Sequence, residues 1–428
     1  MTHIAEFGAR DCSAPQIKGW CPGALQPMLS GDGLLMRPKI LGSRLSLSQA
    51  SEVAGVARDC GNGLIDLSQR AQLQLRGLSE KCFAQAIMRL ACAGLTARDM
   101  RLEAALNILS SPLPGNADAV VESLAQAFPS DQALGSLPGK FLFLVDDGSP
   151  GLDDVLADVR IEISGDAVCV VAEGARDVAA RVSPTEAAEA AMALARAFVR
   201  LRTAAPFERR RMRALTAELG VEAVFREAGL RAEPHRDAWP RANPGGLIGA
   251  GTIGETHFAC LGVGYARLDA AQLSRLVLEA EDCGATELRL SPWRMILVPL
   301  PSRADAEHLV NAAGALGFVV DETDPRLTVL ACSGAPDCPQ ALSATRVALD
   351  ELAPLAARLG AGGVGLHVSG CVKGCARPAP APATLVARGD NLFDLIFDGD
   401  VNGEPFARGV NPVTAARLMA QRAEETGR

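Results

Sequence analysis

The chain has 428 residues, 48% of them apolar and 21% charged, and its formal net charge is −8 at pH 7. These values are typical of a soluble globular protein with material for about three domains, because a domain averages ~150 residues. No apolar run approaches the ~18–20 residues that a transmembrane helix needs. The aromatic content of 4% argues against a surface that stacks nucleic acid bases.

The first residues and the cysteines indicate a reducing compartment. The start, MTHIAEFGARDC, has no basic segment followed by an apolar stretch, so we expect no signal peptide and a cytoplasmic location. The twelve cysteines are then expected to be thiols rather than disulfides. The basic run RRRMR at 209–213 lies in a helical pattern, which favours a solvated helix face.

An internal repeat organises the chain. Residues 45–78 match residues 268–300 at a constant offset of 223, which places Asp59-Cys60-Gly61 on Asp282-Cys283-Gly284. Each copy predicts an apolar-periodic helix that ends at a glycine, followed by two short alternating strands. A strand-like run precedes each copy and a further helix follows it, so each copy forms a small α+β unit.

A longer α/β stretch follows each copy of the repeat. The first stretch has strand signals in KFLFLVDDG, VRIEIS and AVCVVAE, then a helical region from 184 to about 230. The Pro-rich segment EPHRDAWPRANPGG is typical of a linker between the two halves. We therefore expect an α+β protein with four domains, at residues 1–88, 89–244, 245–318 and 319–428.

Two loops carry paired cysteines, and each loop follows an apolar strand-like run. Cys332 and Cys338 lie in TVLACSGAPDCPQAL, and Cys371 and Cys375 lie in LHVSGCVKGCARP. Zinc sites prefer cysteine pairs two to four residues apart, which the first pair exceeds, and loops with glycine and proline are poor places to bury unligated thiols. Four thiolates on glycine-containing loops suit the larger cubane of an iron–sulfur cluster, which we favour over zinc.

The order of these motifs resembles the sulfite and nitrite reductase superfamily. C-x5-C followed later by C-x3-C comes after two copies of an α+β unit, and the resemblance covers nearly the whole chain. It implies duplicated ferredoxin-like half-domains pairing with two α/β domains of the 4Fe–4S type around a central tetrapyrrole cleft. It also implies that the four cysteines hold a 4Fe–4S cluster.

Within this superfamily the chain is similar to the precorrin-3B synthases. The similar segments are WCPGALQPMLSGDGLLMR near the start, RAQLQLRGL at 70–78, LSPWRMILVPL at 290–300 and HVSGCVKGCARPAPAPATLVA at 367–387. The similarity implies an oxidoreductase of aerobic cobalamin biosynthesis, a monooxygenase that uses O2 to hydroxylate precorrin-3A at C20 and closes a γ-lactone. It further implies an electron donor as partner and a non-haem iron beside the 4Fe–4S cluster.

The resemblance also points to a set of cations. The reductase pattern T-x-R-x-x-x-Q-x-R/H-G is matched here by Ser68, Arg70, Gln74, Arg76 and Gly77, with Ala71 where reductases usually have glutamine. An Arg-x-Lys pair on the first strand appears as Arg37 and Lys39. The segment LPGKFLF keeps Lys140 of a K-x-K pair but has Leu142 at its second position.

The loss of the second lysine separates two activities. A small anion reduced at a metal centre needs several converging cations, whereas a porphyrinoid substrate needs cations around its rim for its acetates and propionates. Arginine suits that role because its planar fork binds carboxylates in bidentate fashion. The hypothesised substrate-binding residues are Arg37, Lys39, Arg70, Arg76, Lys140 and Arg294.

No catalytic residue and no iron ligand is assigned by the sequence. Oxygenase iron commonly takes two histidines and a carboxylate, and the chain has five histidines. His257 and His367 are the two worth testing, although a structural role explains each more simply. His235 is expected in the linker, and His308 on the exposed side of a helix.

Two other functions stay open. A sirohaem-dependent sulfite or nitrite reductase would share the cluster cysteines, but Leu142 and the PWR segment at 292–294 disagree with it. A zinc-stabilised binding protein without catalytic activity would use the same four cysteines in another way.

Overall fold

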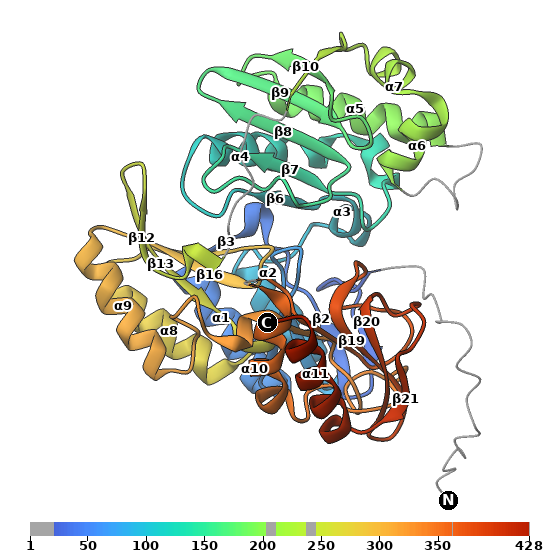
Figure 1. Ribbon diagram of the computed structural model, residues 1–428. Helices are drawn as coiled ribbons and strands as arrows, with labels where there is room; N and C mark the ends of the chain where they lie inside the picture. The colour runs from blue at the N-terminus through green and yellow to red at the C-terminus, as the bar shows by residue number, and fades with distance from the viewer. Residues whose placement is uncertain (1–20, 203–210, 237–244, 362, 428) are drawn as a thin grey trace, which may run out of the picture. The chain divides into compact units, whose positions relative to one another are not determined.

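The computed structural model of the protein describes residues 21–202, 211–236, 245–361 and 363–427 (Figure 1). These residues form two compact units, and the larger one holds residues 21–29 and 33–324. The smaller unit holds residues 30–32 and 325–427. Part of the basic run (209–210), most of the predicted linker (237–244) and His3 lie outside the described residues.

The larger unit contains two five-stranded sheets that follow the repeat. The strands of the first sheet are, in spatial order, β1 (Met28–Ser30), β2 (Gly33–Met36), β5 (Leu73–Leu78), β4 (Leu64–Leu67) and β14 (Arg267–Asp269). Those of the second sheet are β12 (Gly249–Ile253), β13 (Thr256–Gly262), β16 (Met295–Leu300), β15 (Glu287–Leu290) and β3 (Arg44–Ser46). Each copy of the repeat thus gives one edge strand, β3 or β14, to the sheet of the other copy.

The strand register reproduces the sequence offset of 223. Met36 pairs with Leu75 in the first sheet, and Ala259 pairs with Val298 in the second, so both positions shift by that number. The short helical turns before the exchanged strands, Leu41–Ser43 and Gly264–Ala266, keep the same offset. The repeat therefore conserves backbone geometry as well as sequence.

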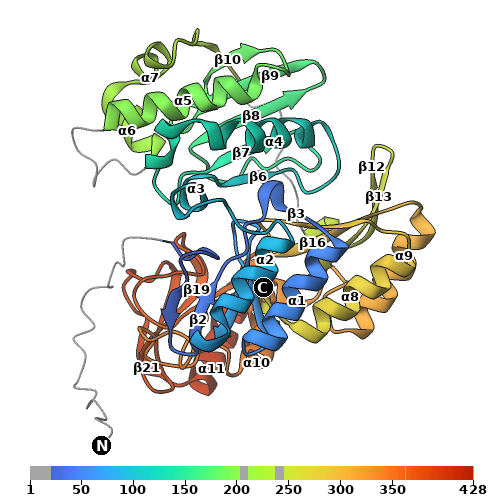
Figure 2. The same ribbon diagram turned by 180° about the vertical axis from the view of Figure 1, so that it is seen from behind.

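Four helices pack on these two sheets. They are α1 (Leu47–Cys60), α2 (Phe83–Cys92), α8 (Ala270–Asp282) and α9 (Arg303–Ala315), and α1 lies against α8 (Figure 2). The start of each repeated helix is fixed by a capping box, formed by Ser46 with Gln49 and by Asp269 with Gln272. Because α2 continues to Cys92, the expected domain boundary at 88 falls inside a helix that packs with the first copy of the repeat.

The third sheet of the larger unit is covered by helices on one side. Its strands are, in order, β11 (Glu233–Pro234), β10 (Val178–Val182), β9 (Ala167–Ala172), β8 (Val159–Ser164), β7 (Phe143–Asp146) and β6 (Ile108–Ser110). Figures 1 and 2 show α4 (Asn116–Ala127) and α5 (Ala187–Leu201) on the same face of this sheet. Three shorter helices complete this region, α3 (Met100–Ala105), α6 (Met212–Leu219) and α7 (Val221–Ala228).

The first residues of the predicted linker belong to this sheet. Glu233 and Pro234 form the edge strand β11, and the buried His235 bonds through Nε2 to Glu162 at 2.8 Å. The expectation that His235 lies in a linker is therefore wrong, because pairing with β10 draws this segment into the fold.

The smaller unit has a mixed sheet of five strands. Their order is β17 (Val329–Ala331), β18 (Leu366–Ser369), β19 (Ala381–Gly389), β20 (Leu392–Gly399) and β21 (Ala407–Val410), and the first three run parallel. The helices α10 (Leu349–Gly360) and α11 (Pro412–Glu425) complete this unit. In the part of the chain that the structure describes, no helix has the length and apolar character to span a bilayer.

Candidate functional site

Arg37 lies just after β2 and is held by an uncharged partner. Its Nε and Nη2 donate to Gln74 Oε1 at 3.1 and 2.8 Å. Burial lowers the pKa of Arg37, and Cys21, which is within hydrogen-bond reach of the guanidinium, opposes that effect. An amide fixes the guanidinium without cancelling its charge, so Arg37 keeps its ability to attract an anion.

Arg70 lies in the turn between β4 and β5 and reaches a neighbouring loop. Its Nη2 donates to the carbonyl oxygen of Lys140 at 3.0 Å. Burial lowers the pKa of Arg70, the nearby guanidinium of Arg211 adds to this effect, and the resulting pKa is about 10. Lys140 itself is exposed. Arg37 also contributes to the lowered pKa, so Arg37 and Arg211 both lie within electrostatic range of Arg70.

Arg211 was missed by the sequence analysis, which assigned its basic run to a solvated helix face. It precedes α6, and its Nε donates to the two carboxylate oxygens of Asp158 at 2.9 and 3.1 Å. Asp158 is completely buried, directly precedes β8, and lies 53 residues before Arg211 in the chain. The sequence around Arg211 contains no pattern that predicts this pairing with Asp158.

Lys39 binds a neighbouring segment of the chain through its ammonium group. Its Nζ donates to the carbonyl oxygen of Glu103 at 2.7 Å and to Asn107 Oδ1 at 3.2 Å. Burial lowers the pKa of Lys39 to about 8. The carboxylate of Glu103 accepts a hydrogen bond from Leu25 N–H at 2.9 Å, which anchors the segment that follows Cys21. Lys39 and Glu103 together tie three separate stretches of chain.

Arg76 follows Gln74 along β5, but its guanidinium is engaged by a carboxylate. Its Nη1 lies 3.3 Å from Asp66 Oδ2, and the side chain is 3% exposed. Asp66 also pairs with Arg267 from the second copy, at 2.6 and 3.1 Å. One buried carboxylate therefore joins two guanidiniums across the two repeats.

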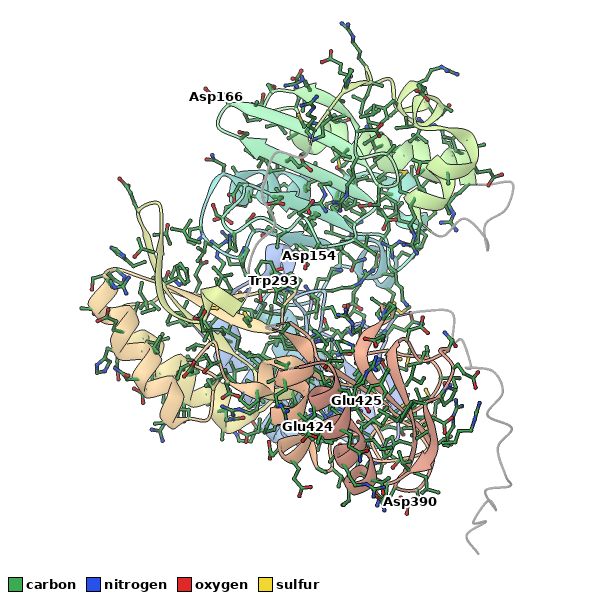
Figure 3. The ribbon with its side chains drawn as sticks, in the orientation of Figure 1. Asp154, Asp166, Trp293, Asp390, Glu424 and Glu425 are labelled. Atoms are coloured by element: carbon green, nitrogen blue, oxygen red, sulfur yellow. The ribbon has the colours of Figure 1, made fainter. Side chains whose placement is uncertain are left out.

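Arg294 and its neighbour Trp293 occupy the turn between β15 and β16. Arg294 has a φ of +63°, a left-handed conformation that is uncommon for a residue other than glycine. Its carbonyl oxygen accepts from Val263 N–H at 3.2 Å. Figure 3 shows Trp293 beside Asp154, and its Nε1 donates to Asp154 Oδ2 at 3.3 Å.

The four paired cysteines gather in the smaller unit. Cys332 directly follows β17, and Cys371 follows β18, the parallel neighbour of β17. Parallel strands end at the same edge of a sheet, so both loops leave from one side. Cys375 interacts electrostatically with the other three sulfurs, which include Cys338.

The cysteine loops are shaped by glycine and by backbone donors. Gly370 N–H donates to Cys332 Sγ at 3.1 Å. Gly334 has a φ of +71°, and a Cβ there would lie 2.5 Å from Thr345 Oγ1. Burial raises the pKa of the Cys332 thiol, while N–H groups of Gly370 and Gly334 oppose that rise. Burial also raises the pKa of Cys375 to about 11.

These sulfurs are near one another without being tightly clustered. Among the described residues, no three His, Cys, Asp or Glu side chains are close enough to hold a single metal ion. A zinc ion needs sulfurs at about 2.3 Å from one centre, whereas a cubane cluster separates its thiolates more widely.

In the described part of the chain, the two histidines considered as candidate iron ligands do not lie in a set of metal-binding side chains. His367 is completely buried within β18. His257 Nδ1 lies 2.9 Å from Thr252 Oγ1 on the β12–β13 hairpin. Within the described ranges, neither joins a set of three ligands for one metal ion. His308 is exposed on α9, as expected.

Comparison with known proteins fixes the relationship that these features suggest. Residues 26–91 match the nitrite/sulfite reductase ferredoxin-like half domain. The chain is 29% identical to a precorrin-3B synthase of Sinorhizobium sp. over 407 residues, which cover 92% of this chain and 86% of that protein. These matches support a relationship of the chain to the sulfite and nitrite reductase superfamily. The predicted resemblance is thereby confirmed.

Two further proteins are similar to the chain, one in sequence and one in structure. The haemoprotein β-component of NADPH sulfite reductase from Acidithiobacillus ferrooxidans is 32% identical over 125 residues, which cover 27% of this chain and 22% of that protein. The NirA protein of Mycobacterium tuberculosis superposes with a TM-score of 0.68 at 19% identity, over 89% of this chain and 77% of that chain. This likeness supports the mixed α+β reductase fold.

Proposed function

We propose that the protein is a precorrin-3B synthase of aerobic cobalamin biosynthesis. In the proposed reaction one oxygen atom of O2 becomes a hydroxyl at C20 of precorrin-3A, and the ring A acetate closes a γ-lactone. The second oxygen atom leaves as water with two electrons and two protons from a donor. The observation that carries this proposal is the similarity to a precorrin-3B synthase over 92% of the chain. The sulfite reductase similarity, in contrast, covers 27%.

The cations of the larger unit would bind the carboxylates of the macrocycle. We assign direct contact to Arg37, Arg70 and Lys140, since Gln74 and the Lys140 carbonyl orient the two guanidiniums without neutralising them. Arg294 is assigned to the rim of the same site. Lys39 and Arg76 are assigned to positioning, because backbone oxygens and Asp66 already engage them.

The four cysteines would hold a 4Fe–4S cluster. Their residue type, their common sheet edge and the Gly370 N–H bond to Cys332 Sγ fit the thiolate ligands and N–H···S bonds of such clusters. When bound, the cluster supplies electrons one at a time. The described residues do not provide a ligand set for a mononuclear iron, so we assign no residue and no step to that group.

The experiment that tests the activity uses the cluster-loaded enzyme. Anaerobically purified protein is mixed with precorrin-3A and a reductant, then exposed to ¹⁸O2, and the product is analysed by mass spectrometry. We expect incorporation of one labelled oxygen atom into the macrocycle. Cys371→Ser should lose the brown chromophore and the activity together, while Cys92→Ser, at an exposed cysteine on α2, should keep both.

A sirohaem-dependent sulfite or nitrite reductase is the second candidate, supported by the fold shared with NirA. Leu142 opposes it, because this side chain is 3% exposed within an apolar core and adds no charge. Purified protein with tightly bound sirohaem, seen as an intense Soret band, would favour the reductase. Zinc without iron and sulfide would instead favour a zinc-stabilised binding protein over both enzymes.

A further inference from the structure

At the position of the missing second lysine, the chain has Leu142, an uncharged side chain that belongs to the core. Leu142 packs into an apolar core, and its N–H donates to Asp158 Oδ2 at 3.0 Å. Asp158 has no exposed surface. A buried carboxylate needs compensating donors or cations, because its desolvation is costly. The backbone N–H of residue 142 therefore serves as a donor to Asp158, and the negative charge of Asp158 requires a cation from elsewhere in the chain.

Arg211 is that partner, and it comes from a distant segment. The Nε of Arg211 binds both oxygens of Asp158, at 2.9 and 3.1 Å, and Met212 N–H donates to Oδ1 at 2.8 Å. The ion pair engages Nε, and 27% of the Arg211 side chain stays exposed. Asp158 thus anchors the guanidinium at one end, while the side chain is still accessible to a ligand.

The anchored guanidinium lies in the same place as the cations already described. Arg70 donates to the carbonyl oxygen of Lys140, two residues before Leu142, whose N–H binds the carboxylate that holds Arg211. Arg70 therefore binds the segment 140–142 directly at Lys140, and Arg211 is linked to it through Asp158. Arg211 lies within electrostatic range of Arg70, and like charges near each other are unfavourable in isolation, so the arrangement is suited to a ligand with several negative charges.

We propose that Arg211 replaces the second lysine of the reductases and is a specificity-determining residue that binds a carboxylate of the tetrapyrrole substrate. This inference rests on the proposed function. The physical reason is the difference between the two cations: lysine is a compact point charge suited to a small anion, whereas the planar guanidinium pairs with a carboxylate through two parallel hydrogen bonds. Moving the charge from position 142 to Arg211 would exchange one ligand class for the other.

The test compares Arg211→Gln with Arg211→Lys and with the control Arg213→Gln. Arg213 lies two residues further along, at the start of the same helix, and is exposed. The probes are uroporphyrin III, with eight carboxylates, and coproporphyrin III, with four, titrated by fluorescence quenching at two salt concentrations. We expect Arg211→Gln to weaken uroporphyrin binding about tenfold or more, since a hydrogen-bonded charge pair is lost, and to reduce its salt dependence. Arg211→Lys should recover part of the affinity, and Arg213→Gln should match the wild type.

Loss of the Arg211 charge also leaves Asp158 buried without its cation, so folding is measured in parallel. If Arg211→Gln is unfolded, the double variant Arg211→Gln/Asp158→Asn, which removes both charges, is titrated instead. Unchanged affinity and salt dependence in the folded variant would overturn the role of Arg211. A wild-type protein that binds neither porphyrin and does not convert precorrin-3A would contradict the proposed function itself. Conversion of precorrin-3A with an unchanged KM in the Arg211 variant would overturn only the present inference.

Discussion

The two copies of the repeat share a backbone frame but differ on the face that carries the polar side chains. At the offset of 223, Arg37 corresponds to Cys260, Arg70 to Trp293 and Gln74 to Leu297. Cys260 and Leu297 are completely buried. The exchanged strands, the capping boxes and the register are the same in both copies. Duplication thus preserved the fold, while the second copy has no counterpart of the Arg37, Arg70 and Gln74 side chains that the first copy contributes to the candidate anion site.

The difference also separates two uses of the same repeated arginine. Arg267 pairs with the buried Asp66, whereas its counterpart Arg44 is 36% exposed and pairs with Glu122, itself 57% exposed. A buried ion pair leaves an uncompensated charge when one partner is removed, but an exposed pair is screened by water. The two copies therefore offer matched experiments on the same frame.

The largest effect is expected from Asp66→Asn. This change leaves the guanidiniums of Arg76 and Arg267 without their shared carboxylate, which should lower the free energy of unfolding by about 3–5 kcal/mol. Urea denaturation measures the loss. The matched change Glu122→Gln should cost at most about 1 kcal/mol, so equal losses at the two sites would contradict the assigned difference.

The next effect comes from exchanging Gln74 and Leu297 between the copies. Leu297→Gln places an amide in a completely buried position and should cost about 1–3 kcal/mol of stability. Gln74→Leu removes the acceptor of Arg37 and should weaken uroporphyrin binding about tenfold with little change in stability. If Leu297→Gln instead weakens binding while Gln74→Leu does not, the site belongs to the second copy.

A pH dependence is expected from Lys39, whose counterpart in the second copy is Gly262. Burial lowers the pKa of Lys39 from 10.5 to about 8 in the folded protein. Between these values the unfolded chain binds more protons than the folded one, so the free energy of unfolding should rise with pH from about 8 to 10.5, by roughly 2–3 kcal/mol. Comparison of wild-type and Lys39→Met unfolding over that range isolates the effect. An identical slope in both proteins would remove Lys39 as its source.

The smallest effect tests what the copies have in common. Ser46→Ala and Asp269→Ala each remove a capping box and should each cost about 1 kcal/mol. Thermal unfolding of the two single variants provides the measurement. A substantial loss at one cap alone would show that the shared frame is not equally stabilised by its two helix starts.

Local patterns in the sequence were sufficient to predict the elements of the repeat. Helix ends at Gly61 and Cys283–Gly284, the paired short strands and the strands at 143–146, 159–164 and 167–172 follow from periodicity, glycine and β-branched residues. The cysteine loops were likewise found from spacing, and the register of β17 and β18 brings them to one sheet edge.

Pairings between distant segments could not be obtained in this way. The resemblance to the reductase pattern grouped Arg76 with Arg70. The pairing of β14 with β4, however, brings Arg267 to Asp66, and the same carboxylate engages Arg76. The basic run around Arg211 had the pattern of a solvated helix, and its attachment to Asp158, 53 residues earlier, has no local signal. His235 was assigned to a linker because its surroundings are rich in proline.

The amino-acid sequence by itself determined the superfamily, the repeat, the cysteine motif and the loss of the second lysine, because each is a pattern of residue types along the chain. Only the tertiary structure decided which cations are neutralised and which stay available. That decision depends on strand register and on contacts such as Arg37 with Gln74 and Arg211 with Asp158, which join residues 37 and 53 positions apart. Arg37 beside an amide keeps its net charge, and 27% of the Arg211 side chain stays exposed beyond its ion pair with Asp158. Arg76, in contrast, is buried with Asp66, and the sequence pattern does not tell these cases apart.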